Sequence, residues 1–170
     1  MKIEVLVLGE LYTNVYILKK DGYSLIIDPA DDYKTILESV KDTKLLGMIV
    51  THEHDDHILA RNDLISSGVT ELEYKENMEV GPFKFKVINN PGHTNDSKTF
   101  YFEKEKIMFV GDFIFKNSIG RTDLDSGNHD EMMKSLKMIE TYPNCKLFPG
   151  HGESTTLDYE KKNNIFFKMI

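Results

Sequence analysis

Cysteine is almost absent from this chain of 170 residues, which contains only Cys145. One cysteine cannot form an intrachain disulfide framework or a zinc site built from several cysteines. A lone cysteine that leads into an apolar run is more often a small packed residue than a reactive thiol. We therefore expect Cys145 to pack in the core.

Positive charge and long apolar runs are also in short supply. The 21 Lys and Arg residues face 28 Asp and Glu residues, for a net charge of −7. Nucleic-acid binding needs a basic face, so this balance argues against a nucleic-acid partner. No apolar run approaches the ~18 residues that span a bilayer, and Glu4 stands where a signal peptide would continue apolar. We expect a cytoplasmic protein with a small-molecule substrate and no membrane partner, and the oligomeric state stays open.

Repeats, low-complexity tracts and linkers are missing as well, so residues 1–170 are expected to form one domain. Strands are expected at Ile3–Leu11, Val15–Lys19, Ser24–Asp28, Leu45–Thr51, Val69–Tyr74, Glu79–Ile88, Thr99–Glu103, Lys106–Val110 and Lys146–Phe148. Helices are expected at Tyr33–Lys41, Ile58–Ser67, Asp130–Glu140 and Asp158–Lys168, with a loop over 113–129. Strands come first and then mix with helices, which predicts a layered α/β architecture.

Several of the predicted strands end in a residue type that binds metals. The residues that follow these apolar runs are Asp28, His52, His93, Asp112 and His151. If the strands end on the same rim of the sheets, their end loops converge and bring five of the six histidines together. Glycine precedes His93, Asp112 and His151, and it allows the tight turns that aim side chains at a shared centre.

The stretch 51–57, Thr-His-Glu-His-Asp-Asp-His, holds three of the histidines. In extended backbone His52 and His54 point to the same side, whereas one turn can present Asp56 and His57 to a second centre. The candidate ligands are too many for one tetrahedral ion and suit two. A structural metal site is the alternative, but such sites are usually closed and built with cysteine. His129 has no motif partner and is not expected to be a ligand.

Four segments together resemble the motifs of the metallo-β-lactamase superfamily. They are Thr51-His52-x-His54-x-Asp56-His57, Pro91-Gly92-His93-Thr94, Gly111-Asp112 and Pro149-Gly150-His151-Gly152. The stretches that follow Asp112 and His151 resemble the small single-domain branch of glyoxalase II-like hydrolases, the hydroxyacylglutathione hydrolases. The resemblance implies a four-layer αββα sandwich with the metal site at one edge of the two sheets.

The same resemblance implies how the ligands divide. His52, His54 and His93 would hold the first ion. Asp56, His57 and His151 would hold the second, with Asp112 bridging and Asp28 behind the ligands. Two divalent ions are expected, with zinc as the first choice and iron or manganese as alternatives. Two cations that share a water lower its pKa, and the resulting hydroxide would attack a thioester or ester carbonyl, with Asp56 as the catalytic residue.

This chain departs from the family pattern in ways that bear on the substrate. Ala60 and Asp96 stand where the family usually has glycine, and Asp55 and Asp96 are expected to add negative charge near the metals. The C-terminal helical domain that helps full-length glyoxalase II to hold glutathione has no matching positions here. Lys116 and Arg121 are therefore the candidates for binding a substrate carboxylate.

Two other functions compete with a hydrolase. Persulfide dioxygenases share the scaffold and a Gly-Arg-Thr-Asp loop like residues 120–123. They use one iron held by two His and an Asp, which corresponds here to His52 or His54 with His93 and Asp112. The third possibility is a non-catalytic metal-binding protein, which would bind metal tightly without turnover of any ester, thioester or lactone.

Overall fold

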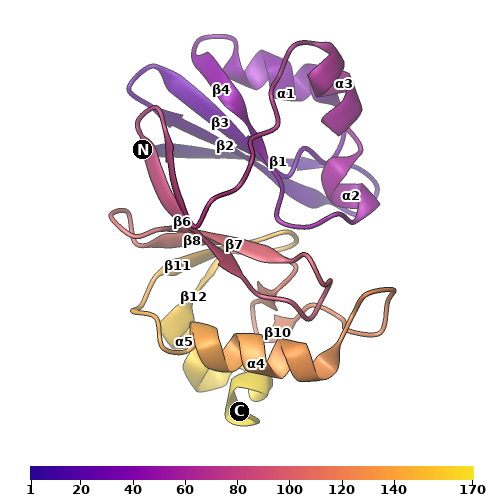
Figure 1. Ribbon diagram of the computed structural model, residues 1–170, viewed down its shortest axis with the longest axis vertical. Helices are drawn as coiled ribbons and strands as arrows, with labels where there is room; N and C mark the ends of the chain where they lie inside the picture. Colours follow the sequence, from indigo (N-terminus) through magenta and orange to yellow (C-terminus); the bar gives the residue numbers. More distant parts are fainter.

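The computed structural model describes residues 1–170 and places two β-sheets face to face, with helices on both outer sides (Figure 1). The first sheet has the order β1-β2-β3-β4. Its strands are β1 (Lys2–Leu8), β2 (Thr13–Lys20), β3 (Tyr23–Ile27) and β4 (Lys44–Ile49). Strands β3 and β4 are parallel, and the helix α1 (Tyr33–Val40) connects them. Two short helices, α2 (Asp55–Ile58) and α3 (Arg61–Ser66), follow β4.

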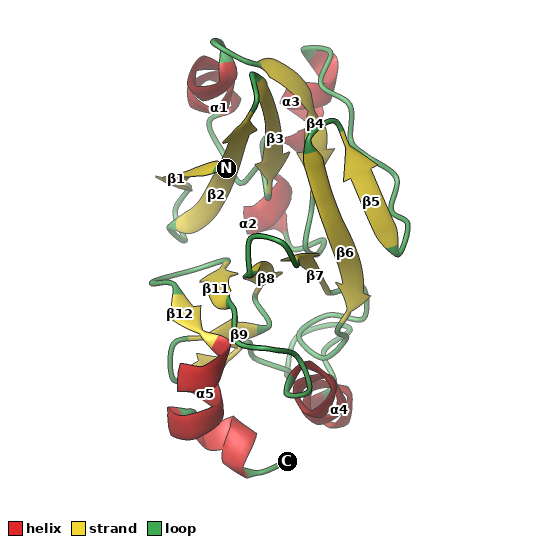
Figure 2. Cartoon of the chain, turned by 90° about the vertical axis from the view of Figure 1, so that its left-hand side faces the viewer, coloured by secondary structure: helices red, strands yellow, loops and turns green.

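The second sheet has the order β12-β11-β8-β7-β6-β5. Its strands are β5 (Asn77–Val80), β6 (Phe83–Asn89), β7 (Lys98–Phe102), β8 (Ile107–Gly111), β11 (Lys146–Pro149) and β12 (Thr155–Thr156). A small hairpin of β9 (Ile114–Phe115) and β10 (Ser118–Ile119) follows β8. The remaining elements are α4 (His129–Ile139), α5 (Leu157–Asn163) and the 3-10 helix η1 (Ile165–Lys168). Figure 2 shows α4 and α5 on the side of this sheet that faces away from the first.

Three separate hydrophobic clusters fill the three interfaces of this αββα sandwich, which confirms the predicted architecture. Strand β2 shows why the layers form, because its residues alternate between two faces. Tyr16 and Leu18 belong to the cluster between the sheets, whereas Val15 and Ile17 belong to the cluster that also contains Ile36 of α1. The third cluster lies between the second sheet and α4 and α5, and it contains Cys145, which is 3% exposed as a packing role requires.

The directions of the strands bring their carboxyl ends to one edge. The parallel pair β3 and β4 ends at that edge in the first sheet, and the parallel pair β8 and β11 ends there in the second. Strand β6 runs in the same direction, because both it and β8 are antiparallel to β7. The loops after five strands therefore converge, as the sequence pattern predicts.

Some predicted elements are wrong in extent or kind. The segment Val69–Tyr74 makes only a single bridge, Met48 with Glu71, because the hydroxyl of Tyr74 turns back to bond the backbone of Val50. The expected strand Glu79–Ile88 is a hairpin that turns at Gly81 and Pro82. The loop expected over 113–129 contains the hairpin β9–β10.

Two predicted helices are interrupted for identifiable reasons. The helix expected at Ile58–Ser67 is divided near Ala60, whose N–H donates to the carbonyl of Pro29 instead of to its own helix. The helix expected at Asp158–Lys168 ends before Asn164, which has extended backbone and accepts a hydrogen bond from the N–H of Phe166. In both places a contact outside the helix competes with the helical hydrogen bond.

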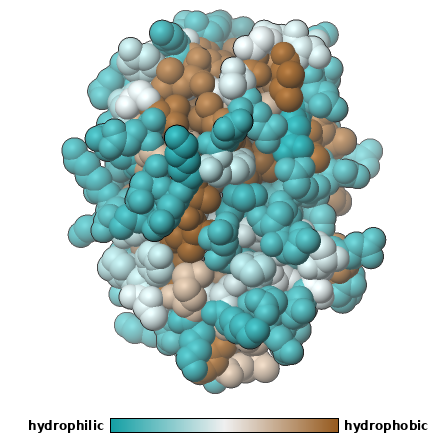
Figure 3. Space-filling view, viewed as in Figure 1, coloured by the Kyte–Doolittle hydropathy of each residue, from teal (hydrophilic) through white to brown (hydrophobic).

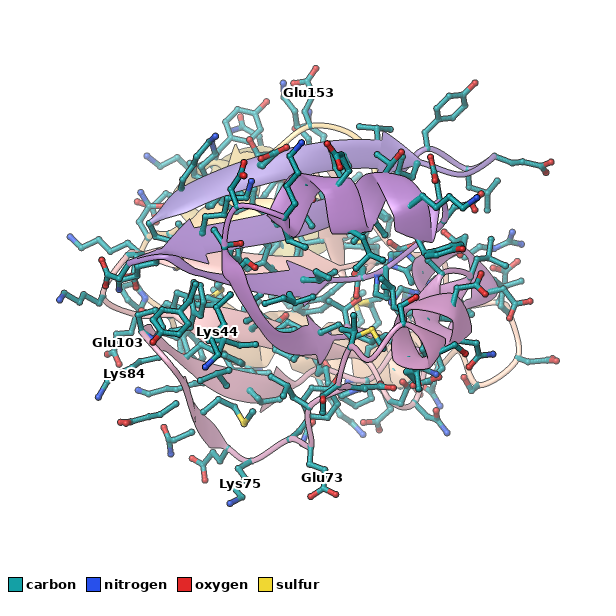
Figure 4. The ribbon with its side chains drawn as sticks, turned by 90° about the horizontal axis from the view of Figure 1, so that it is seen from above. Lys44, Glu73, Lys75, Lys84, Glu103 and Glu153 are labelled. Carbon is teal, nitrogen blue, oxygen red and sulfur yellow. The ribbon has the colours of Figure 1, made fainter.

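The surface is rich in charge. Hydrophilic groups cover most of the face in Figure 3, with hydrophobic atoms between them mainly in the upper half. Labelled side chains such as Lys75, Lys84 and Glu153 point outward from the ribbon in Figure 4. None of the helices combines the length and the apolar character that crossing a bilayer requires.

Candidate metal centre

The edge where the strand ends converge gathers imidazole and carboxylate groups into one cluster. Three sets of side chains offer ligand atoms within 4.8 Å of one another: His52, His54 and His93; His52, His57 and Asp112; and Asp56, His57 and His151. The structure therefore brings together all seven residues that the sequence nominated as ligands. Their role as ligands stays a prediction.

Close approach of backbone to side chain makes this cluster possible at Gly150. A β-carbon on Gly150 would collide with Oδ1 of Asp112 and with the ring of His57. Glycine before His151 therefore allows the loop after β11 to lie directly against the centre. The N–H of Asn14 donates to the carbonyl of Gly150 (2.7 Å), which fastens that loop to the first sheet.

The first set of histidines forms a tight group. Nε2 of His93 lies 2.9 Å from Nδ1 of His54, and the rings of His52 and His54 are 4.9 Å apart between centroids. Two nitrogens that bind one tetrahedral ion at ordinary bond lengths are roughly 3.3 Å apart. The His54 and His93 nitrogens are thus close to that separation, and a nitrogen of His52 lies within 4.8 Å of both.

Asp112 lies between the set of His52, His54 and His93 and the set of Asp56, His57 and His151. Its Oδ1 lies 3.3 Å from Nε2 of His57, and its Oδ2 lies 3.6 Å from Nε2 of His93 and 3.5 Å from Nε2 of His151. Asp56 belongs to the set with His57 and His151, and its Oδ2 lies 3.1 Å from Nε2 of His151. A carboxylate that faces ligands of both sets has the position that a bridging role between two ions would require.

Four of the imidazoles are fixed by a contact at the ring nitrogen that faces away from the centre. Nδ1 of His57 contacts Asp28 (3.0 Å), and Nδ1 of His52 contacts the hydroxyl of Thr51 (3.0 Å). Two backbone carbonyls do the same, with Leu11 O at 3.0 Å from His151 and Arg121 O at 2.7 Å from His93. Partners of this kind select the tautomer and orientation that metal-binding histidines need.

The carboxylates of the cluster favour positive charge on two of its imidazoles. Burial opposes protonation of His57, but the carboxylates of Asp28 and Asp112 outweigh it and raise its pKa to about 10. Hydrogen bonds to Asp112 and Asp56 raise the pKa of His151 to about 10. Burial favours the protonated form of Asp56, yet the bond from His151, the nearby His57 and the bond from Thr13 lower its pKa to about 2.

At two other rings the effect of burial outweighs that of the acidic neighbours. Burial and the nearby His57 lower the pKa of His52 to about 3, which keeps that imidazole neutral. Burial also lowers the pKa of His93. A neutral imidazole is the form that binds a metal.

The residues fit a pair of cations. Nε2 of His52, Nε2 of His57 and Oδ1 of Asp112 are buried atoms without a hydrogen-bond partner, and all three belong to the cluster. Buried polar atoms are costly unless they are paired, and metal coordination is one way to pair them. Nitrogen and carboxylate oxygen suit zinc, iron or manganese.

A pocket of about 460 Å³ opens beside the cluster. Its lining combines ligand candidates with three apolar side chains, Leu11, Phe115 and Leu124. Arg121 also lines it, but its guanidinium makes two hydrogen bonds to Asp123 (2.7 and 2.8 Å).

Other charged candidates lie outside this lining. Lys116 is exposed and pairs with Glu153 (2.6 Å), so the structure does not bring it to the pocket. Asp96 is 3.6 Å from Lys98, and Asp55 lines a neighbouring depression. His129 is exposed at the start of α4 and belongs to none of the ligand sets.

Sequence reasoning missed the residues that hold the ligands in place. Thr13 donates to Oδ2 of Asp56 (2.9 Å), and Thr51 contacts both Asp28 and His52. Thr51 adjoins the histidine motif, so its position was a usable signal. The carbonyls of Leu11 and Arg121 carry no residue-specific signal, because every residue has one.

The sequence model of the metallo-beta-lactamase superfamily matches residues 8–68 and 59–151. This chain belongs to that superfamily. The two matched stretches together include all seven clustered residues. The cluster therefore lies within the stretches that match the family, and its imidazole and carboxylate groups suit divalent metals.

Relatives of similar length support a hydrolase-like protein. An uncharacterized protein of Aquifex aeolicus (strain VF5) is 32% identical, covering 98% of this chain and 97% of that protein. The probable metallo-hydrolase YqgX of Bacillus subtilis (strain 168) is 27% identical, with 98% and 97% covered. Hydroxyacylglutathione hydrolase GloC of Haemophilus influenzae is 24% identical, with 98% of each covered.

Solved structures agree on the fold. The B3 metallo-beta-lactamase BLEG-1 has a TM-score of 0.91 at 27% identity, covering 97% of this chain and 99% of that one. TTHA1623 in a di-iron-bound form has a TM-score of 0.86 at 26% identity, with 96% and 99% covered. ETHE1 from Myxococcus xanthus has a TM-score of 0.88 at 27% identity, with 96% and 83% covered.

Proposed function

We propose that this chain is a metal-dependent hydrolase of thioester or ester bonds, with S-lactoylglutathione or a related thioester as the first candidate substrate. The proposal rests on the position of Asp112 between the trio His52, His54 and His93 and the trio Asp56, His57 and His151. The relative named hydroxyacylglutathione hydrolase supports the choice of thioester.

The proposed cofactor is two divalent cations, zinc first, with iron or manganese as alternatives. His52, His54 and His93 would hold one cation, Asp56, His57 and His151 the other, and Asp112 would bridge. When bound, the cations polarise the substrate carbonyl and lower the pKa of a shared water. The di-iron form of TTHA1623 shows that a structure of this fold accepts iron.

The chain's own groups would orient the reactants and move the proton. Thr13 and His151 engage Oδ2 of Asp56, so we assign Oδ1 of Asp56 to accept the proton of the attacking water. The apolar side chains of Leu11, Phe115 and Leu124 would exclude bulk water from the scissile bond. Arg121 would meet an anionic part of the substrate, because it is the cationic side chain in the lining.

The test combines metal analysis of the purified protein with hydrolysis of S-lactoylglutathione. We expect about two ions per chain and turnover that chelation abolishes. Asp112→Asn should keep the fold, as judged by circular dichroism, but lose one ion and at least about 100-fold in kcat. His129→Asn, on an exposed residue outside the cluster, is the matched control. Two ions and full activity in Asp112→Asn would disprove the bridging role.

The same preparation separates the competing functions. The likeness to ETHE1 is consistent with the alternative of a persulfide dioxygenase. That alternative predicts one iron and oxygen uptake on glutathione persulfide. A non-catalytic metal-binding protein predicts bound metal with no turnover of a panel of esters, thioesters and lactones. Either result would overturn the proposed hydrolase.

A further inference from the structure

A buried carboxylate outside the metal centre lies on the C-terminal helix. Glu160 of α5 is 0% exposed, and no ligand set contains it. Its carboxylate accepts three hydrogen bonds: from Oγ1 of Thr155 (2.5 Å), from the N–H of Asn117 (2.9 Å) and from Nδ2 of Asn164 (2.9 Å). A carboxylate accepts and does not donate, so three donors satisfy it.

Two of these contacts end on the turn of the hairpin β9–β10. The turn residue Asn117 has left-handed backbone (φ 63°), and its N–H is held by Glu160. Asn164, also 0% exposed, donates to the carbonyl of Ser118 (2.9 Å) as well as to Glu160. Figure 2 shows α5 below β9 and β12. Glu160 and Asn164 therefore fasten both sides of the turn to α5.

The hairpin in turn adjoins the metal centre on both of its strands. Phe115 of β9 lines the pocket, and its ring centroid is 6.2 Å from that of His151. After β10, Gly120 packs so closely on the carbonyl of Asp112 that a β-carbon there would collide with it. The next residue, Arg121, supplies the carbonyl 2.7 Å from Nδ1 of His93.

We propose that Glu160 and Asn164 are positioning residues that hold the hairpin β9–β10, and through the carbonyl of Arg121 set the orientation of His93. The path from α5 to the centre has two links: hydrogen bonds at 117–118, then the short strand β10 that leads to 120–121. The part of this proposal that concerns substrate rests on the proposed hydrolase function, whereas the parts that concern backbone order and metal affinity do not.

The chemistry of the contacts predicts which substitutions are tolerated. Glu160→Gln can keep all three partners, because its amide oxygen can accept from Asn117 and Asn164 while its NH₂ donates to the hydroxyl of Thr155. Glu160→Ala leaves those partners without an acceptor. Asn164→Ala removes the donor to Ser118 while keeping the carboxylate. The control is Leu157→Ala, which removes a buried side chain from the core side of α5 and leaves every hydrogen bond between α5 and the hairpin in place.

The first measurement is amide hydrogen exchange over 117–121 in the full-length, metal-free protein. Glu160→Ala and Asn164→Ala should speed exchange at least about tenfold there, and Glu160→Gln should restore most of the protection. Leu157→Ala should lower the melting temperature without selective exchange at 117–121. Equal exchange at 117–121 in Glu160→Ala and Leu157→Ala would overturn the proposal.

The second measurement is zinc affinity by competition with a chromophoric chelator. Loss of an outer partner of a ligand histidine typically weakens binding about 10–100-fold, so Glu160→Ala should bind the first zinc at least about tenfold more weakly. If hydrolysis is detected, Glu160→Ala should raise KM more than it lowers kcat, since Phe115 and Arg121 line the pocket. If no ester or thioester is turned over, the proposed function fails, and exchange and zinc affinity still decide the role of Glu160. Unchanged zinc affinity in Glu160→Ala would refute the link to His93.

Discussion

Asp28 is the residue on which the first sheet's contribution to the centre depends. It is 1% exposed and accepts from the N–H of Thr51 (2.7 Å), the hydroxyl of Thr51 (2.8 Å) and Nδ1 of His57 (3.0 Å). Its backbone is left-handed (φ 53°), a conformation that Asp and Asn adopt more readily than most residues. The carboxylate of Asp28 thus orients the ring of His57 and holds the backbone that follows β4.

Asp28→Asn should therefore weaken binding of the ion proposed for Asp56, His57 and His151. The amide keeps the backbone and the shape but removes the charge that supports His57. We expect affinity for the second zinc to fall by about 10–100-fold, measured by chelator competition. Asp21→Asn is a matched control, because Asp21 is exposed and also left-handed (φ 51°). Equal zinc affinities in the two variants would contradict the role of Asp28.

The guanidinium of Arg121 is already paired with the carboxylate of Asp123. Its two bonds to Asp123 raise the pKa of the guanidinium and, from the other side, lower the pKa of Asp123 to about 2. Asp123→Asn should free Arg121 for an anionic substrate and raise kcat/KM for S-lactoylglutathione a few-fold, with little change for an uncharged ester. Asp125→Asn, in the same exposed loop, is the control. If Asp123→Asn changes kcat/KM equally for the charged and the uncharged substrate, Arg121 does not bind the anionic part of the substrate.

At the scale of elements, the start of α4 is tied to the loop that carries His93. The side chain of Asn128 caps α4 by accepting from the N–H of Glu131 (3.0 Å), and its own N–H donates to the carbonyl of Gly92 (2.8 Å). Asn128 therefore both caps α4 and holds the loop that carries His93. The helix therefore supports the ligand loop as well as the core.

Asn128→Ala should cost about 1 kcal/mol of unfolding free energy through the lost cap. For a chain of this size that corresponds to a decrease of about 2–4 °C in melting temperature, measured by calorimetry. Asn128→Asp should keep the cap and most of the stability, since Asp caps as well as Asn. A melting temperature equal to that of the unchanged protein in Asn128→Ala would show that the cap is not formed.

The elements that the sequence predicted well are those with strong periodicity. The strands around 15–19, 24–28 and 99–110 and the helix near 130–140 are found, because their apolar spacing matches one buried face. The failures have tertiary causes. The bond from Ala60 to Pro29 and the return of Tyr74 to Val50 join residues far apart in sequence, which periodicity does not register.

The candidate site also has a part that the sequence predicts and a part that depends on tertiary contacts. The clustered side chains could be nominated from the sequence because imidazole and carboxylate after apolar runs are rare and specific. The contacts that orient them could not, since Leu11 and Arg121 act through backbone carbonyls and Glu160 is 43 residues from the turn residue that it contacts. Such partners are defined by position in space and not by residue type.

At the scale of the whole molecule, the metal-free protein should lose stability as the pH rises. The pKa values of His57 and His151 rise from 6.5 to about 10 on folding, so their contribution is complete below about pH 6.5 and is lost as the pH approaches 10. The melting temperature with chelator should therefore fall between pH 7 and pH 9. With zinc the imidazoles must be neutral, so the difference between the two samples should widen. A metal-free melting temperature that rises over this range would contradict the prediction.

The ligand sets draw on both halves of the chain, and this has a consequence for folding. His57 follows the last strand of the first sheet, whereas His151 follows β11 of the second, roughly 100 residues later. An ion bound to both would close that long loop as a covalent cross-link does, which in the chain-entropy treatment is worth about 4–5 kcal/mol. A protein with a single cysteine would thus obtain from its cofactor the restraint that others obtain from a disulfide. Removal of the metal should then make the unfolding transition of the two sheets less cooperative.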